Sequence, residues 1–176
     1  MKIRFILIAL YFSLPFFWTG TAVFSQSDLD SLWSVWKDES KADTLRFEAI
    51  TNFIRHDDQN LSGDSTLYYA QLAYDFAESR GLKIEMTNAL IIQTRTVYLN
   101  GEYAKALDLA NQNLTICNEI GYKKGSSRAL IFMGMAYDKL GNYFQALSCY
   151  FKCIKSTKTL RFSQINSKAS NTTGSV

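Results

Sequence analysis

The amino-acid sequence predicts an all-α protein built from stacked antiparallel helix pairs, and three observations support this fold class. Residues 89–113 and 129–153 repeat one pattern 40 positions apart. A period of this length is typical of helical units that cannot bury their apolar faces alone. The only proline is Pro15, and proline inside a helix is strongly unfavourable, so the rest of the chain can form long helices. Four glycines recur every 20 residues and predict left-handed helix caps: Gly81, Gly101, Gly121 and Gly141.

Residues 1–25 have the layout of a secretory signal peptide. Lys2 and Arg4 form a short basic end, an apolar run covers residues 5–18, and small and polar residues follow up to Ser25. The apolar run is shorter than the about 20 residues that a membrane span needs. We therefore expect export across the inner membrane, to the periplasm or the exterior. An uncleaved N-terminal anchor is the alternative.

The expected elements follow in order after Gln26. An amphipathic leading helix falls within residues 26–40, where Leu29, Leu32, Trp33 and Trp36 lie at helical spacing. A repeat domain over residues 41–162 then contains three units, at about 43–81, 82–121 and 122–161. Its expected helices are 43–55, 67–79, 84–99, 103–119, 124–139 and 143–159, with a polar loop at 57–65. Residues 163–176 contain few apolar side chains, and we expect a disordered tail there.

Charge and cysteine content exclude several classes of site. Residues 26–80 carry 11 acidic and 5 basic residues, whereas residues 81–176 carry 5 and 12. The late lysines recur at helical spacing and lack interleaved aromatic residues, so we interpret them as a solvated helix face rather than a nucleic-acid site.

The three cysteines are Cys117, Cys149 and Cys153, and the last two lie one helical turn apart, where a disulfide is unfavourable. We expect buried free thiols, no metal site and no cofactor.

No motif in the sequence predicts an enzyme. A glycine-rich phosphate loop, a GxSxG motif and an HExxH motif are all missing from the sequence. His56, Asp57 and Asp58 could form an acid–base cluster, but they follow a helix end and open a polar loop. We interpret them as surface residues, and we expect no catalytic activity.

The run 133–150, MGMAYDKLGNYFQALSCY, resembles a tetratricopeptide repeat. The resemblance covers about 120 residues and is most specific in the last unit. It departs from the family at Thr94 and Val97, in a unit length of 40 rather than 34 residues, and in the missing proline. It implies a right-handed α-solenoid in which a small residue allows close helix contact and aromatic residues fill the wedge. The matching signature residues are Gly101, Tyr103, Ala106, Gly134, Tyr137, Gly141, Tyr143, Ala146 and Tyr150.

The resemblance also implies that the first helix of each pair lines a concave surface that binds a protein or peptide. The candidate residues there are Arg55, Asn88, Ile91, Arg95, Tyr98, Arg128, Ile131 and Met135. Arg55 and Arg95 could bind a carboxylate, or they could pair with Glu48, Asp58 or Glu102. The Lys/Asn set with which chaperone-binding members hold a terminal carboxylate is missing, which disfavours that role.

Long units of this kind are similar to the exported sensor regions of bacterial signalling proteins. The expected function is therefore an exported scaffold for protein–protein interaction. The alternative is the N-terminal input region of a longer membrane signalling protein, of the histidine kinase or adenylate/guanylate cyclase type. The last helix, 143–159, would leave an apolar face open, which indicates either truncation or obligatory pairing. Contact with a membrane would come only through an uncleaved signal or a missing C-terminal region.

Overall fold

A computed structural model describes residues 26–56 and 61–173 of the 176-residue chain, with side chains described between residues 28 and 158. Every regular element in these ranges is a helix, so the all-helical prediction is confirmed for the described part of the chain. The helices are α1 (Gln26–Lys37), α2 (Asp43–His56), α3 (Gly63–Ser79), α4 (Lys83–Leu99), α5 (Tyr103–Glu119), α6 (Lys123–Lys139) and α7 (Tyr143–Thr173). The expected signal peptide lies outside the described residues.

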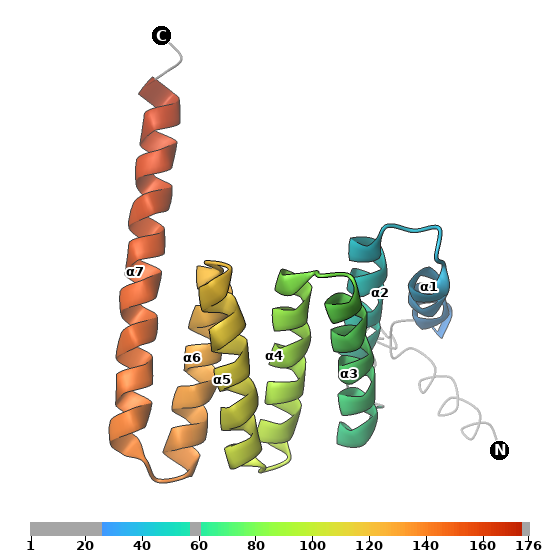
Figure 1. Ribbon diagram of the computed structural model, residues 1–176, viewed down its shortest axis with the longest axis horizontal. Helices are drawn as coiled ribbons and strands as arrows, with labels where there is room; N and C mark the ends of the chain where they lie inside the picture. Colours follow the sequence, from blue (N-terminus) through green and yellow to red (C-terminus); the bar gives the residue numbers. More distant parts are fainter. Residues whose placement is uncertain (1–25, 57–60, 174–176) are drawn as a thin grey trace, which may run out of the picture.

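The helices stand side by side in chain order, from α1 at one end to α7 at the other (Figure 1). Each helix packs against the next, and α4 also contacts both α2 and α6. Within the described ranges the backbones of α3 and α5, and those of α5 and α7, do not come as close, although Gln112 on α5 donates to the Tyr74 hydroxyl on α3 at 3.4 Å. The helices α2, α4 and α6 therefore form one closely spaced layer, and α3, α5 and α7 form the other.

The four turns that connect α3 through α7 have the same geometry because each contains a glycine in the left-handed conformation. Gly81, Gly101, Gly121 and Gly141 have φ values of 65°, 83°, 68° and 76°. In each turn the next residue donates its backbone N–H to a carbonyl five positions earlier, as Tyr122 does to Cys117 at 2.8 Å. This is the Schellman pattern, which stops a helix within two residues. The predicted glycine caps are confirmed.

Replacing Gly121 by alanine should destabilise the protein by about 1–2 kcal/mol, because a Cβ disfavours the left-handed conformation. No other atom lies within 4 Å of the position that this Cβ would take, so the loss reports the backbone conformation alone. Urea unfolding of the two proteins measures the difference. The exposed residue Lys123 in the next helix gives a control, since Lys123→Ala should change stability by less than about 0.5 kcal/mol. Equal stabilities for Gly121→Ala and the parent would contradict the assigned turn.

Two hydrophobic clusters hold the array together. The first joins α1 to α4, where Trp36 packs edge-on against Phe76 with ring centroids 4.8 Å apart. Arg46 is buried there and donates its Nε–H to the Trp36 carbonyl at 3.0 Å, which satisfies a carbonyl near the end of α1. The second cluster joins α5, α6 and α7 around Leu130 and Met133.

Equivalent residues of the repeat make equivalent contacts between paired helices. The buried Asn113 on α5 donates its Nδ2–H to the Thr87 carbonyl on α4 at 2.6 Å. Forty residues later, the Cys153 thiol on α7 lies 3.5 Å from the Ser127 carbonyl on α6, in position to donate a weak hydrogen bond. The 40-residue period is therefore a repeat of contacts as well as of sequence.

Two boundaries differ from the sequence-based expectations by more than one residue. Helix α3 begins at Gly63 instead of residue 67, because the Ser62 hydroxyl accepts the backbone N–H of Ser65 and caps the helix earlier. Helix α7 runs to Thr173, whereas we expected disorder from residue 163. No proline or glycine lies between Gly141 and Gly174, so nothing in the local sequence stops the helix. As Figure 1 shows, α7 extends well beyond α6. Residues 174–176 lie outside the described part.

Candidate binding site

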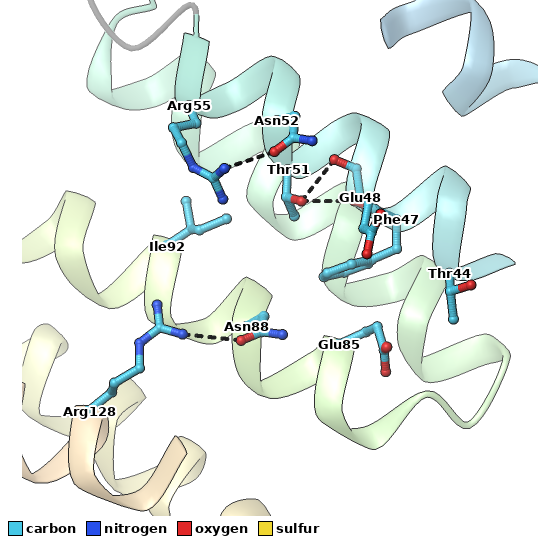
Figure 2. A pocket seen from close by; sticks show the side chains of 10 residues that line it. All are labelled: Thr44, Phe47, Glu48, Thr51, Asn52, Arg55, Glu85, Asn88, Ile92 and Arg128. Carbon is cyan, nitrogen blue, oxygen red and sulfur yellow. Dashed lines mark hydrogen bonds between the residues drawn. The ribbon is translucent and has the colours of Figure 1, made fainter. Parts of the chain in front are cut away.

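A hollow of about 390 Å³ opens on the layer formed by α2, α4 and α6 (Figure 2). Its volume is within the range of pockets that hold small ligands or short peptide segments. Six residues of α2, three of α4 and one of α6 line it: Thr44, Phe47, Glu48, Thr51, Asn52, Arg55, Glu85, Asn88, Ile92 and Arg128. Three different helices thus contribute to a single surface feature.

The hollow contains a row of residues at equivalent positions in the three units. Glu48, Asn88 and Arg128 are separated by 40 residues each, and they change from acidic to neutral to basic along the row. Arg128 donates from Nη1 to Asn88 Oδ1 at 3.2 Å, which links the second and third units directly. This contact confirms that α4 and α6 lie side by side in the same register.

The two arginines of the hollow are oriented by neutral partners. Arg55 donates from Nη1 to Asn52 Oδ1 at 2.8 Å, and Arg128 donates to Asn88 as described. An amide oxygen fixes the position of a guanidinium without neutralising its charge. Both arginines therefore keep their positive charge for an anion, and Figure 2 shows the Ile92 side chain between the two guanidinium groups.

The acidic residues lie toward the other end of the hollow. Glu48 and Glu85 project from α2 and α4, and the Phe47 ring lies close to Glu48 (Figure 2). Phe47 is buried and forms part of the apolar floor. Within the described residues, neither carboxylate has a side chain within hydrogen-bond or ion-pair distance. Two carboxylates beside an aromatic ring form an arrangement that favours a cation.

A smaller hollow of about 140 Å³ shares Arg55 and Arg128 with the first. Arg95 and the buried Ile91 also line it, and none of its lining residues in the described part of the chain is acidic. The basic end of the larger hollow therefore continues into a second space in which α2, α4 and α6 each contribute an arginine.

The structure brings together five of the eight candidate surface residues proposed from the sequence. Arg55, Asn88, Ile91, Arg95 and Arg128 line one or both hollows. The other three do not. Tyr98 packs against Tyr103 and Phe132 instead, with ring centroids 5.4 and 6.5 Å apart. Ile131 is exposed and Met135 is half-buried, and both lie outside the two hollows.

Among the described residues, the alternative ion pair of Arg55 with Glu48 is not formed. Arg55 bonds Asn52 rather than Glu48, and Glu102 accepts from Lys105 Nζ at 3.2 Å. Asp58 lies outside the described residues. Glu85 and Ile92 also line the larger hollow, although they were not among the residues predicted from the sequence. Their spacing of three and four residues from Asn88 on the same helix face could have identified them.

Several of the signature residues occupy the contacts between paired helices. A Cβ added to Gly134 would lie 2.5 Å from Tyr150 Cε1, so α6 and α7 approach each other through this glycine. Ala106 and Ala146 are buried, whereas Tyr143 is 70% exposed at the start of α7. These residues shape the array and do not reach the hollow.

The three cysteines are free thiols; Cys117 and Cys149 are buried, as predicted, whereas Cys153 is only half-buried. Burial raises the pKa of both thiols, which keeps them protonated and unreactive at neutral pH. No group of metal-binding side chains occurs among the described residues. Within those same ranges, every helix is too short or too polar to cross a bilayer.

An apolar face of α7 forms a second surface feature. Phe144, Leu147, Phe151 and Ile154 are each at least half exposed. Leu147 and Ile154 are the repeat equivalents of Leu107 and Leu114, which pack into the second cluster between α5 and α6. The exposed face of α7 is thus equivalent to the face of α5 that packs against α6, the first helix of the following unit.

Leu107→Ala should therefore destabilise the protein by about 1–2 kcal/mol, whereas Leu147→Ala should change stability by less than about 0.5 kcal/mol. The physical reason is that the first side chain is half-buried against α6, and the second is 54% exposed. Chemical denaturation of the two variants at low protein concentration measures the difference. A loss of the same size at both positions would mean that α7 is covered in solution.

No protein-family model matches this chain, and a comparison with curated proteins also finds no match. The fold and the hollow together define an all-helical, repeat-like array with a polar pocket across three of its helices.

Proposed function

We propose that this protein is an exported tetratricopeptide-like scaffold, without catalysis of its own, that binds a protein or peptide partner on the α2–α4–α6 layer. The observation that carries the proposal is the hollow lined by equivalent residues of three successive units, Glu48, Asn88 and Arg128. A stacked array offers such a surface without any further element. The closer spacing of α2, α4 and α6 supports a solenoid with this layer on the concave side.

Two further features support the tetratricopeptide-like assignment. The glycine turns repeat one geometry, and Gly134 provides the close approach that the resemblance implies for a helix pair. The right-handed sense of the solenoid and the export of the chain are part of the same proposal.

Site-specific photo-cross-linking in the producing cells tests this function. A photoreactive residue at Thr51, which lines the hollow, should give a specific adduct with the partner. The same residue at Asp108, exposed on α5 in the other layer, should give no such adduct. Adducts at both positions, or at neither, would argue against binding on this layer.

The alternative function is that of an input region for a membrane signalling enzyme. The open apolar face of α7 favours it, because that face matches the surface that receives a further unit in this array. The gene sequence after the codon for Val176 tests it. An open reading frame that continues into a kinase or cyclase domain would support this alternative, and an immediate stop codon would favour the scaffold.

A further inference from the structure

The opposite charges at the two ends of the larger hollow limit the chemistry of what can bind there. Arg55 and Arg128 lie at one end, and Glu48 and Glu85 lie at the other (Figure 2). A ligand of a single charge would meet repulsion at one end. Among the described residues no ion pair joins any of these four side chains to a charge of opposite sign, and a neutral ligand would provide none.

From these charges we propose that the hollow binds a bipolar peptide segment, with a carboxylate at the arginine end and a Lys or Arg side chain at the glutamate end. This inference rests on the proposed function and adds the charge pattern of the partner. The basic end can form charge-assisted hydrogen bonds to the carboxylate from two guanidinium groups. The acidic end offers two carboxylates and the Phe47 ring to the cation.

The length of the hollow sets the spacing of the two ligand charges. Glu48 and Arg55 are seven residues apart on α2, which corresponds to a rise of about 10 Å. An extended peptide covers that distance in about three residues. The ligand charges should therefore be separated by about three positions, as in Lys-x-x-Glu or Glu-x-x-Lys.

The middle of the hollow suits the uncharged part of such a segment. Thr51 supplies partly apolar surface between the charged ends, and it adjoins Ile92 at the basic end and Phe47 at the acidic end. Asn88 and Asn52 each use the side-chain oxygen on an arginine, which leaves their amide N–H groups available to peptide carbonyls. The floor can therefore accept an extended backbone with small intervening side chains.

A charge-exchange experiment on the full-length protein tests the inference. Labelled peptides with blocked ends carry Lys-x-x-Glu, Glu-x-x-Lys, Lys-x-x-Lys or Glu-x-x-Glu, and fluorescence anisotropy gives their dissociation constants. The wild-type protein should bind at least one bipolar peptide about tenfold more tightly than either like-charged peptide. A peptide with the two charges adjacent should bind more weakly, because it cannot reach both ends.

Two double variants should change this preference in opposite directions. Arg55→Glu with Arg128→Glu makes both ends acidic, so Lys-x-x-Lys should become the preferred peptide by about tenfold. Glu48→Lys with Glu85→Lys makes both ends basic, so Glu-x-x-Glu should be preferred. A control variant, Lys152→Glu with Lys158→Glu, changes net charge on exposed residues of α7 and should retain the wild-type preference.

The outcomes separate this inference from the function on which it rests. Peptide binding without a charge preference, or a preference that the double variants leave unchanged, would overturn the bipolar inference and leave a peptide-binding scaffold. Failure of every peptide to bind would also overturn it, while cross-linking at Thr51 would still decide whether a partner occupies this layer. A further peptide, in which a free C-terminal carboxylate replaces the glutamate side chain at the same spacing from the lysine, shows whether the hollow binds a chain terminus or an internal segment.

Discussion

Replacing Asn113 by aspartate is expected to lower the stability of the protein by about 3–5 kcal/mol at pH 7, because it places an unpaired charge in the interior. Asn113 is fully buried, donates to the Thr87 carbonyl at 2.6 Å and accepts from the Cys117 thiol at 3.1 Å. An ionised aspartate has the same shape but no proton to donate. Its charge would face the carbonyl oxygen of Thr87.

The loss should depend on pH in a defined direction. Burial and the facing carbonyl disfavour the ionised form, so the pKa of this aspartate in the folded state is raised above its unfolded value of about 3.9. The folded state then binds more protons than the unfolded state. The variant should therefore approach wild-type stability below about pH 4 and lose stability as pH rises toward the folded-state pKa.

Urea unfolding of both proteins between pH 4 and pH 8 measures this difference. Asn111→Asp provides the matched control, because residue 111 is exposed two positions away on the same helix. That variant should remain within about 0.5 kcal/mol of wild type at every pH. A penalty for Asn113→Asp that does not change with pH would contradict the buried donor contact to Thr87.

Gly134→Ala is expected to destabilise the protein by about 1–3 kcal/mol, although alanine is the better helix former by about 1 kcal/mol. The added Cβ would lie 2.5 Å from Tyr150 Cε1 and 2.8 Å from Tyr150 Cζ, which is too close for a carbon contact. Either the ring or the α6–α7 spacing must shift. In this helix interior the steric effect should exceed the gain in helix propensity.

The sign of the effect should reverse when Tyr150 is truncated. In a Tyr150→Ala background no ring occupies the space, so Gly134→Ala should stabilise the protein by up to about 1 kcal/mol. A double-mutant cycle by thermal or urea unfolding isolates this coupling. The same change in stability in both backgrounds would show that the glycine is not required for the contact with Tyr150.

Most helix boundaries could be predicted from the sequence because local chemistry decides them. The left-handed conformation of Gly101 or Gly121 depends on the missing Cβ, and each Schellman turn forms within two residues of it. The expected range 103–119 agrees fully with α5, and the ranges for α4 and α6 differ by a single residue. The start of α3 was less predictable, since Ser62 and Ser65 compete as capping residues in a polar segment.

The candidate site was predictable only as a helix face. A period of 40 residues indicates that Asn88 and Arg128 occupy equivalent positions, but their direct hydrogen bond depends on how α4 and α6 pack. The contacts of Tyr98 also depend on helix packing, because this side chain packs against Tyr103 and Phe132 and lines neither of the two hollows. Spacing along one helix cannot show which neighbour covers a side chain.

The sequence by itself determined the helices, their glycine turns and the 40-residue period, because hydrogen bonds and backbone preferences within a few residues decide each of them. The tertiary structure alone decided which charges share one hollow. Glu48 and Arg128 are 80 residues apart, and only the packing of α2, α4 and α6 places them in the same pocket. Segments far apart in the chain meet through side-chain packing between helices, and that packing is a property of the whole array.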